Sequence, residues 1–319
     1  MLMKTAEIKF GGRGKKPLAA GQGKVKRTWD RSNERIRDVM HSAAFLGPSV
    51  TGVAVFFIVP FLVVVYYSVI RSPLNPEFVF LDNFKAVLGN SSFRTAAGNT
   101  AMFSAIAVPL AVVLSLGLAL LLECRIPCKS LFRTFFLSPM MVPVASVVLI
   151  WQVVFHYRGT LNVILANFHV EPIDWLNSKY CLLVIVVLFL WKNLGYNMIL
   201  FMAALNNIPK ELLEVADVEG ASAAHKFFNI KLRYLSPTVL FVAILSIINS
   251  FKVFREIYLL VGKYPFDGLY MMQHFMNNTF ENFDYQKMAS AAVLMALVMV
   301  ALIALLFKAE DIFGKDVEG

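Results

Sequence analysis

Six long apolar stretches constrain the fold of this chain more than any other feature of its sequence. The hydrocarbon core of a bilayer is about 30 Å thick, and a helix needs about 20 apolar residues to cross it. No alternation typical of barrel strands of about ten residues is visible. Because backbone groups in lipid must be hydrogen-bonded within the protein, we expect an all-α membrane protein with six transmembrane helices. The expected spans are residues 43–69, 97–122, 132–155, 181–204, 237–261 and 289–307.

The charged residues are few and unevenly distributed. They make up 16% of the chain, whereas soluble domains contain about 25%. Of the 30 Lys and Arg residues, 11 precede His41. Residues 1–41 are rich in Gly and Lys and lack apolar periodicity, so we expect a mobile basic cytoplasmic tail that contacts anionic membrane lipid. RNA binding by this tail is the less favoured alternative, and we expect no nucleic-acid partner.

The basic residues between the spans orient the chain in the membrane. With the N-terminus inside, the inner parts hold 20 Lys and Arg residues and the outer loops hold 7. We therefore expect both termini in the cytoplasm, a transmembrane permease domain over residues 42–312 and a short cytoplasmic tail over residues 313–319. The segment 208–237, between the fourth and fifth spans, is then cytoplasmic as well.

Motifs of enzymes and of nucleotide-binding proteins are missing from the sequence. No G-x-x-x-x-G-K-[ST] occurs, so we expect this chain not to bind ATP through a P-loop. No H-E-x-x-H, G-x-S-x-G or Cys/His cluster is present either. These absences favour a transport protein over an enzyme, with no catalytic residue, no metal site and no cofactor bound by this chain.

The cytoplasmic segment carries local signals for two short helices. Pro209 suits the first turn of a helix, where Glu211 and Glu214 would lie near the positive end of the helix dipole. Gly220 ends this helix, because glycine readily adopts the left-handed conformation, and Ser222 can cap a second helix. The signals predict a helix–turn–helix that is either a docking element for a cytoplasmic partner or an amphipathic hairpin on lipid.

The same segment reads "IPKELLEVADVEGAS" followed by "FFNIKLRYLSP", and it resembles the EAA loop of ABC-importer permeases. The family pattern is E-A-A, three residues, G, nine residues and I-x-L-P. It is matched in register by Glu214, Ala216, Gly220, Ile230 and Leu232. It is not matched by Val215, Glu219 and Arg233. Segments that begin at Gly159, Leu190 and Ile248 are similar to the sugar-type branch, so the resemblance covers about residues 40–312.

The resemblance implies the transmembrane fold of a type I importer in the inner (plasma) membrane of a bacterial cell. A second permease, expected to be a different chain, would pair with this one. Separate ATP-binding subunits would use ATP and Mg²⁺, and an extracellular solute-binding protein would deliver a sugar or oligosaccharide. The EAA loop, residues 208–237, would transmit closure of the ATPase. The residues expected to couple it are Glu211, Glu214, Ala216, Glu219, Gly220, Ala221 and Ser222.

Ionisable residues inside a span are costly, and they are usually functional or paired. Lys192 lies near the midplane of its expected span, and we expect it to face the protein interior or a water-filled cavity. Lys252 and Arg255 lie in the outer half of theirs and could instead snorkel outward. Neighbouring amides could equally form interhelical hydrogen bonds. The expected translocation path is lined by Trp191, Lys192, Asn193, Tyr196, Asn197, Asn249, Lys252 and Arg255.

Two alternatives to sugar import stay open at this point. The excess of cations over acids within the spans is compatible with glycerol phosphate or an acidic oligosaccharide as the solute. A membrane scaffold without transport activity, with its hairpin on lipid, is the alternative from a different class of protein.

Overall fold

A computed structural model describes residues 42, 44–74, 76–124 and 127–314 of the chain. The described residues divide into two units, with the boundary between Leu62 and Val63. The expected basic tail, residues 1–41, lies outside the described residues, as do residues 315–319 of the expected C-terminal tail. The described part is almost entirely helical, and its only β-pairing is an isolated antiparallel bridge between Ile70 and Phe78. The expectation of an all-α fold is confirmed.

Six helical segments in the described residues are long and apolar enough to cross a membrane, as predicted. The first includes a π-helical stretch, Ala54–Ile58, and α2 (Val59–Val69). Their bounds agree with the expected spans within several residues, except in the third. The six candidate spans are Ala44–Val69, Ser91–Glu123, Val144–Ala166, Cys181–Asn206, Ser236–Val261 and Tyr285–Asp311.

The third apolar stretch is divided into two helices rather than forming the single helix expected over residues 132–155. The first, α5, spans Lys129–Met141, and the second, α6, spans Val144–Phe155. Between them Val142 is extended, with φ −81° and ψ 132°. A residue before proline is disfavoured in the α conformation, and Pro143 has no N–H to donate, so the helix ends here. A short helix, α7 (Thr160–Ala166), follows α6 within the third candidate span.

The fifth stretch also has an interruption that the sequence pattern did not predict. Helix α12 covers Ser236–Phe251 and α13 covers Phe254–Val261. Lys252 and Val253 form the turn between them, where the N–H of Lys252 donates to the carbonyl of Asn249 at 3.1 Å. One of the cations expected on the transport path therefore lies at a helix break in the middle of a span.

The residues from 63 onward form a bundle centred on α4 (Ser91–Glu123) and α8 (Cys181–Asn206). Helix α4 packs against α8 and α12, and α5 packs against α8. The C-terminal helix α15 (Tyr285–Gly314) packs against α12, α14 (Met272–Glu281) and α3 (Asp82–Gly89). Gly195 permits the close approach of α5 and α8, because a Cβ at this position would lie 1.8 Å from the carbonyl oxygen of Phe136.

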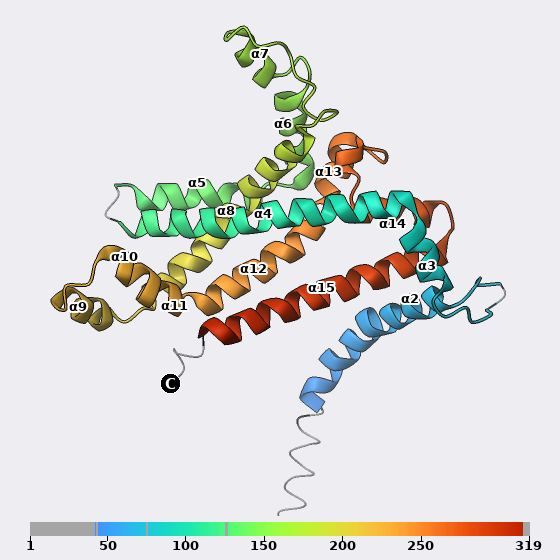
Figure 1. Ribbon diagram of the computed structural model, residues 1–319, viewed down its shortest axis with the longest axis horizontal. Helices are drawn as coiled ribbons and strands as arrows, with labels where there is room; N and C mark the ends of the chain where they lie inside the picture. Colours follow the sequence, from blue (N-terminus) through green and yellow to red (C-terminus); the bar gives the residue numbers. More distant parts are fainter. Residues whose placement is uncertain (1–41, 43, 75, 125–126, 315–319) are drawn as a thin grey trace, which may run out of the picture. The chain divides into compact units, whose positions relative to one another are not determined.

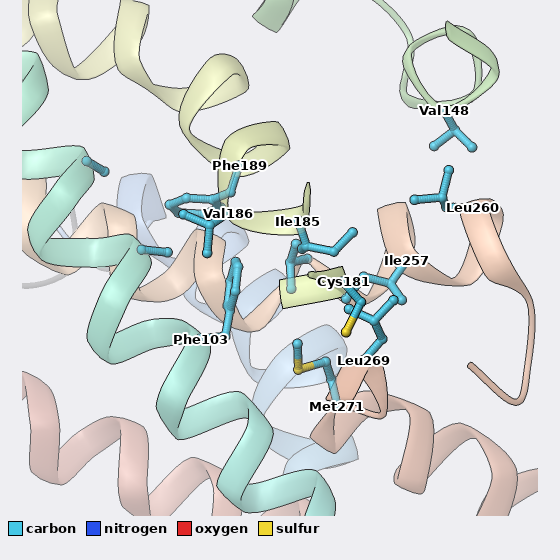
Figure 2. Packing of buried hydrophobic residues seen from close by; sticks show 13 residues of the cluster. Phe103, Val148, Cys181, Ile185, Val186, Phe189, Ile257, Leu260, Leu269 and Met271 are labelled. Carbon is cyan, nitrogen blue, oxygen red and sulfur yellow. The ribbon is translucent and has the colours of Figure 1, made fainter. Parts of the chain in front are cut away.

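The largest group of buried apolar side chains joins α4, α6, α8 and α13 (Figure 2). Phe103 and Phe189 meet edge to face with their ring centroids 5.5 Å apart, an arrangement that contributes about 0.5–1.5 kcal/mol beyond burial. Ile257 of α13 is fully buried in the same cluster. Association of helices in lipid depends on such close packing rather than on exclusion of water.

Two sets of connections lie at opposite ends of α4 (Figure 1). At one end, Lys231 of the EAA loop binds both carboxylate oxygens of Glu123, the last residue of α4, at 2.8 and 2.7 Å. At the other end, the N–H of Met272 donates to the hydroxyl of Thr100, near the start of α4, at 2.9 Å. The EAA loop and the connection before α14 therefore lie at opposite ends of α4.

Candidate functional site

The EAA loop begins with α9 (Lys210–Val218), a short helix with some of its apolar side chains exposed and one buried. Val215 is 56% exposed and Val218 is 90% exposed, whereas Ala216 is only 7% exposed. Glu211 and Glu214 are exposed on the same helix, with Glu211 in its first turn. An apolar surface flanked by acidic residues on a protruding helix is typical of a protein contact.

The turn after α9 has the geometry that its glycine predicts. Gly220 has φ +76°, and the N–H of Ala221 donates to the carbonyl of Ala216 at 2.9 Å. Gly220 itself donates to Asp217 at 3.1 Å, and the two bonds together make a Schellman motif. Ser222 then caps the next helix by accepting from the N–H of His225 at 3.2 Å.

The second half of the helix–turn–helix is less regular than the first. It consists of α10 (Ala223–Lys226), a π-helical stretch (Phe227–Lys231) and α11 (Leu232–Tyr234). An ion pair between Lys226 and Asp217 connects this half to α9 across the turn. The expected pair of helices is thus present. Glu219 is the C-cap residue of α9, and it is exposed like the other acidic residues of the loop.

Buried contacts join the EAA loop to the bundle. Ile208 and Leu235, at its two ends, belong to one apolar cluster with Leu122 of α4 and Leu205 of α8. The Lys231–Glu123 ion pair adds a polar connection to the same end of α4. The loop is therefore held at both ends while the outer face of α9 stays exposed.

A polar cavity of about 280 Å³ lies between α8, α12 and α13. It brings together six of the eight residues expected on the transport path. Those six are Lys192, Asn193, Tyr196, Asn249, Lys252 and Arg255. The remaining lining residues are Met140, Leu188, Phe189, Leu245, Val253 and Glu256.

Lys192 forms an ion pair with Glu256 of α13, a residue that the sequence analysis did not select. Glu256 is only 5% exposed, and its Oε2 has no hydrogen-bond partner among the described residues. The signal that could have identified it is the cost of a cation in a membrane span, which favours pairing with an acid on a neighbouring helix. Lys192 is thus not an uncompensated cation, and the excess of cations in the spans is smaller than the sequence indicated.

The amides of the expected path separate into two groups. Asn249 donates to the side-chain oxygen of Asn193 at 3.0 Å, and both residues line the polar cavity. Asn197 instead is buried and donates to the hydroxyl of Ser246 at 3.1 Å, as an interhelical hydrogen bond. Trp191 does not line the cavity, and its ring meets that of Trp151 edge to face with centroids 6.0 Å apart. The structure does not bring Asn197 and Trp191 to this cavity.

A buried histidine lies outside the candidate spans, in α14. His274 is fully buried, and its Nδ1 accepts from the N–H of Met271 at 3.2 Å. The rings of Phe254, Tyr258 and Tyr270 surround it. Burial lowers the pKa of His274 to about 4, because an apolar environment disfavours the charged imidazolium.

The six candidate spans among the described residues, and the polar cavity bordered by the fourth and fifth of them, agree with the expectation of a membrane transport protein. Residues 111–318 match the family described as binding-protein-dependent transport system inner membrane component. The chain belongs to this family, which confirms the resemblance seen in the EAA loop.

Curated relatives of the chain are sugar-type permeases. The arabinooligosaccharides transport system permease protein of Bacillus subtilis (strain 168) is 32% identical over 68% of this chain and 70% of the relative. The trehalose/maltose transport system permease protein of Thermococcus litoralis is 30% identical over 84% of this chain and 92% of the relative. The sn-glycerol-3-phosphate transport system permease protein of Agrobacterium fabrum is 29% identical over 82% of this chain and 92% of the relative.

A solved structure has the same fold. It is a chain of a bacterial ABC transporter involved in the import of the acidic polysaccharide alginate. The TM-score is 0.76 at 17% identity, and the match covers 88% of this chain and 98% of the other. The expected type I importer fold is confirmed, and the low identity limits this comparison to the fold.

Proposed function

We propose that this chain is the permease subunit of an ATP-driven, binding-protein-dependent importer of a sugar or oligosaccharide. Membership of the permease family supports this proposal, as do relatives named for arabinooligosaccharides and for trehalose and maltose. The chain would lie in the inner membrane of a bacterial cell with both termini in the cytoplasm. It would pair with a second, different permease and receive solute from an extracellular binding protein.

The observation that carries the proposal is the exposed outer face of the EAA loop. The sequence has no P-loop, so ATP and Mg²⁺ would be used by separate ATP-binding subunits that need a contact on this chain. Helix α9 offers Val215 and Val218 as apolar contacts, flanked by the carboxylates of Glu211, Glu214 and Glu219.

The turn of the EAA loop would set the direction in which this face meets the ATPase. Gly220 and Ser222 shape the turn, in which the N–H of Ala221 donates to the carbonyl of Ala216.

The experiment tests both assembly and transport. We expect Val218→Asp to reduce co-purification of the ATP-binding subunits and solute uptake, because it places a charge in the apolar contact. Its 90% exposure means that the substitution should not disturb folding of this chain. Phe168→Asp, at an exposed apolar residue outside the EAA loop, is the matched control and should leave co-purification unchanged.

Substitutions at the predicted coupling residues give the decisive result. If Gly220 and Glu214 variants retain normal ATPase co-purification and normal uptake, the EAA loop is not the coupling element and the proposal fails. A membrane scaffold, the alternative from another class, predicts no substrate-stimulated ATP hydrolysis by the reconstituted complex.

A further inference from the structure

The charges that line the polar cavity do not cancel. Three cations line it, Lys192, Lys252 and Arg255, together with one acid, Glu256. The acid is bound to Lys192. Lys252 and Arg255 have no ion-pair partner among the described residues. With all four side chains ionised, the cavity holds two positive charges in excess.

The position of Glu256 makes this excess informative. Glu256 lies four residues after Lys252, a spacing at which side chains of opposite charge commonly pair. Its Oε1 nevertheless accepts from Lys192 of α8. The acid nearest to Lys252 and Arg255 is thus directed to another helix, and the two cations share the cavity with each other.

Two like charges three residues apart repel, and cations within a span are costly. The span is interrupted at Lys252 and Val253, and both residues of this helix break line the cavity. The same cavity holds the hydrogen-bonded amides of Asn193 and Asn249. A ligand that carries both an anionic group and hydroxyl groups would satisfy these side chains together.

We propose that the polar cavity binds an anionic sugar, with Lys252 and Arg255 contacting its carboxylate or phosphate and Asn193 and Asn249 contacting its hydroxyls. Glu256 holds Lys192 and so leaves the other two cations available to the ligand. A volume of about 280 Å³ lies near the lower end of ligand pockets, which measure about 300–1,000 Å³, and suits a single sugar ring. This inference rests on the proposed function, since it names the solute class for the same path.

The test compares single-ring probes that differ in charge. Binding of galactose, galacturonate and galactose 6-phosphate is measured by equilibrium dialysis on the complete permease–ATPase complex in nanodiscs, without the binding protein. We expect galacturonate or galactose 6-phosphate to bind at least about tenfold more tightly than galactose, because hydrogen bonds to charged groups are the stronger ones. The better of the two acids identifies the anionic group that the cavity prefers.

Variants assign the effect to the two cations. Lys252→Gln and Arg255→Gln should each reduce affinity for the preferred acid by about tenfold and leave galactose binding unchanged. Arg255→Lys keeps the positive charge and should retain most of the affinity. Lys85→Gln removes an exposed cation on α3 that pairs with Asp82 at 3.5 Å, and it should have no effect.

Equal binding of galactose and both acids, or full retention of acid binding in Lys252→Gln and Arg255→Gln, would overturn the proposal. In that case the two cations snorkel or pair with an acid of the second permease. ATP hydrolysis and ATPase co-purification are measured on the same preparations. If both persist while charge preference is absent, only the anion inference fails; if both are absent, the proposed importer function fails with it.

Discussion

The protein should lose more stability when Lys192 is removed from its ion pair with Glu256 than when Glu256 is removed. The Lys192 side chain is 25% exposed and the Glu256 side chain is 6% exposed. Lys192→Met leaves a shielded carboxylate, and its Oε2 already lacks a hydrogen-bond partner among the described residues. Glu256→Gln leaves an ammonium group that borders the polar cavity, where water can reach it.

The expected magnitudes follow from these exposures. Removing one partner of a buried pair costs about 3–5 kcal/mol, because the other charge stays buried and uncompensated. We expect Lys192→Met to lie near the upper value and Glu256→Gln near or below the lower one. The double variant Lys192→Met with Glu256→Met should be more stable than Lys192→Met alone, since replacing both charges by apolar groups is often close to neutral.

The assay uses a cysteine already in the protein. Cys181 is buried, whereas Cys124 and Cys128 are exposed. With the two exposed cysteines replaced by Ser, a thiol-reactive dye reports unfolding through Cys181 during heating of the purified protein. At about 2–4 °C per kcal/mol, a loss of about 5 kcal/mol lowers the Tm by about 10–20 °C.

Two results would refute this reasoning. If the double variant melts no higher than Lys192→Met, an unpaired Glu256 is not the source of the instability. If Glu256→Gln is the more damaging single change, the charge that needs compensation is Lys192. The calibration variant is Lys85→Gln, whose exposed pair should change the Tm by less than about 2 °C.

Three further perturbations test separate parts of the structure. Gly220→Ala should destabilise the EAA-loop turn by about 1 kcal/mol through backbone strain alone, since no atom lies within 4 Å of the added Cβ; Gly220→Asn should be tolerated better, and ATPase co-purification measures both. Gly195→Ala should prevent normal assembly of α5 on α8, because the added Cβ would overlap the backbone of Phe136; size-exclusion chromatography in detergent would show aggregation, and a monodisperse profile would contradict the contact. Stability should fall as the pH drops from about 6.5 to about 4. In this range His274 becomes protonated in the unfolded chain but stays neutral in the folded protein, where it is buried. The free energy of unfolding should fall by about 3 kcal/mol over this pH range. His274→Asn, which can still accept from the N–H of Met271, should flatten the pH dependence of the Tm.

The sequence predicted those features that depend on local signals. The spans follow from apolar length, and the turn of the EAA loop follows from Gly220 and Ser222, whose roles are set by their own backbone geometry. The break at Pro143 was within reach of the same reasoning, because the residue before a proline avoids the α conformation. The pattern of hydropathy masked it, since Val142 is apolar like its neighbours.

Contacts between distant residues were not predictable in this way. Glu256 pairs with Lys192 across 64 positions of sequence, and apolar periodicity carries no information about such a pairing. Asn162 is similar: it donates to the carbonyls of Tyr157 and Ile173 at 2.8 Å each and accepts from the indole of Trp175 at 3.0 Å. These bonds fix the connection between the third and fourth spans, yet the sequence shows only one asparagine in a short amphipathic run.

Helix α12 joins the two candidate sites of the chain. It starts at Ser236, directly after Leu235, which is buried at the end of the EAA loop. It continues without interruption through Asn249 in the polar cavity and ends at Phe251, next to the break at Lys252. A 16-residue helix is about 24 Å long and moves as a nearly rigid element. In the proposed importer, a displacement of the EAA loop would therefore reach Asn249 and Lys252 directly, while α13 beyond the break keeps Glu256 on Lys192. Because the break separates Lys252 from Glu256, movement of α12 would change the distance between the cations and this acid. In the proposed importer, the turn at Lys252 and Val253 would therefore be the place where motion of the EAA loop changes the arrangement of charges in the cavity.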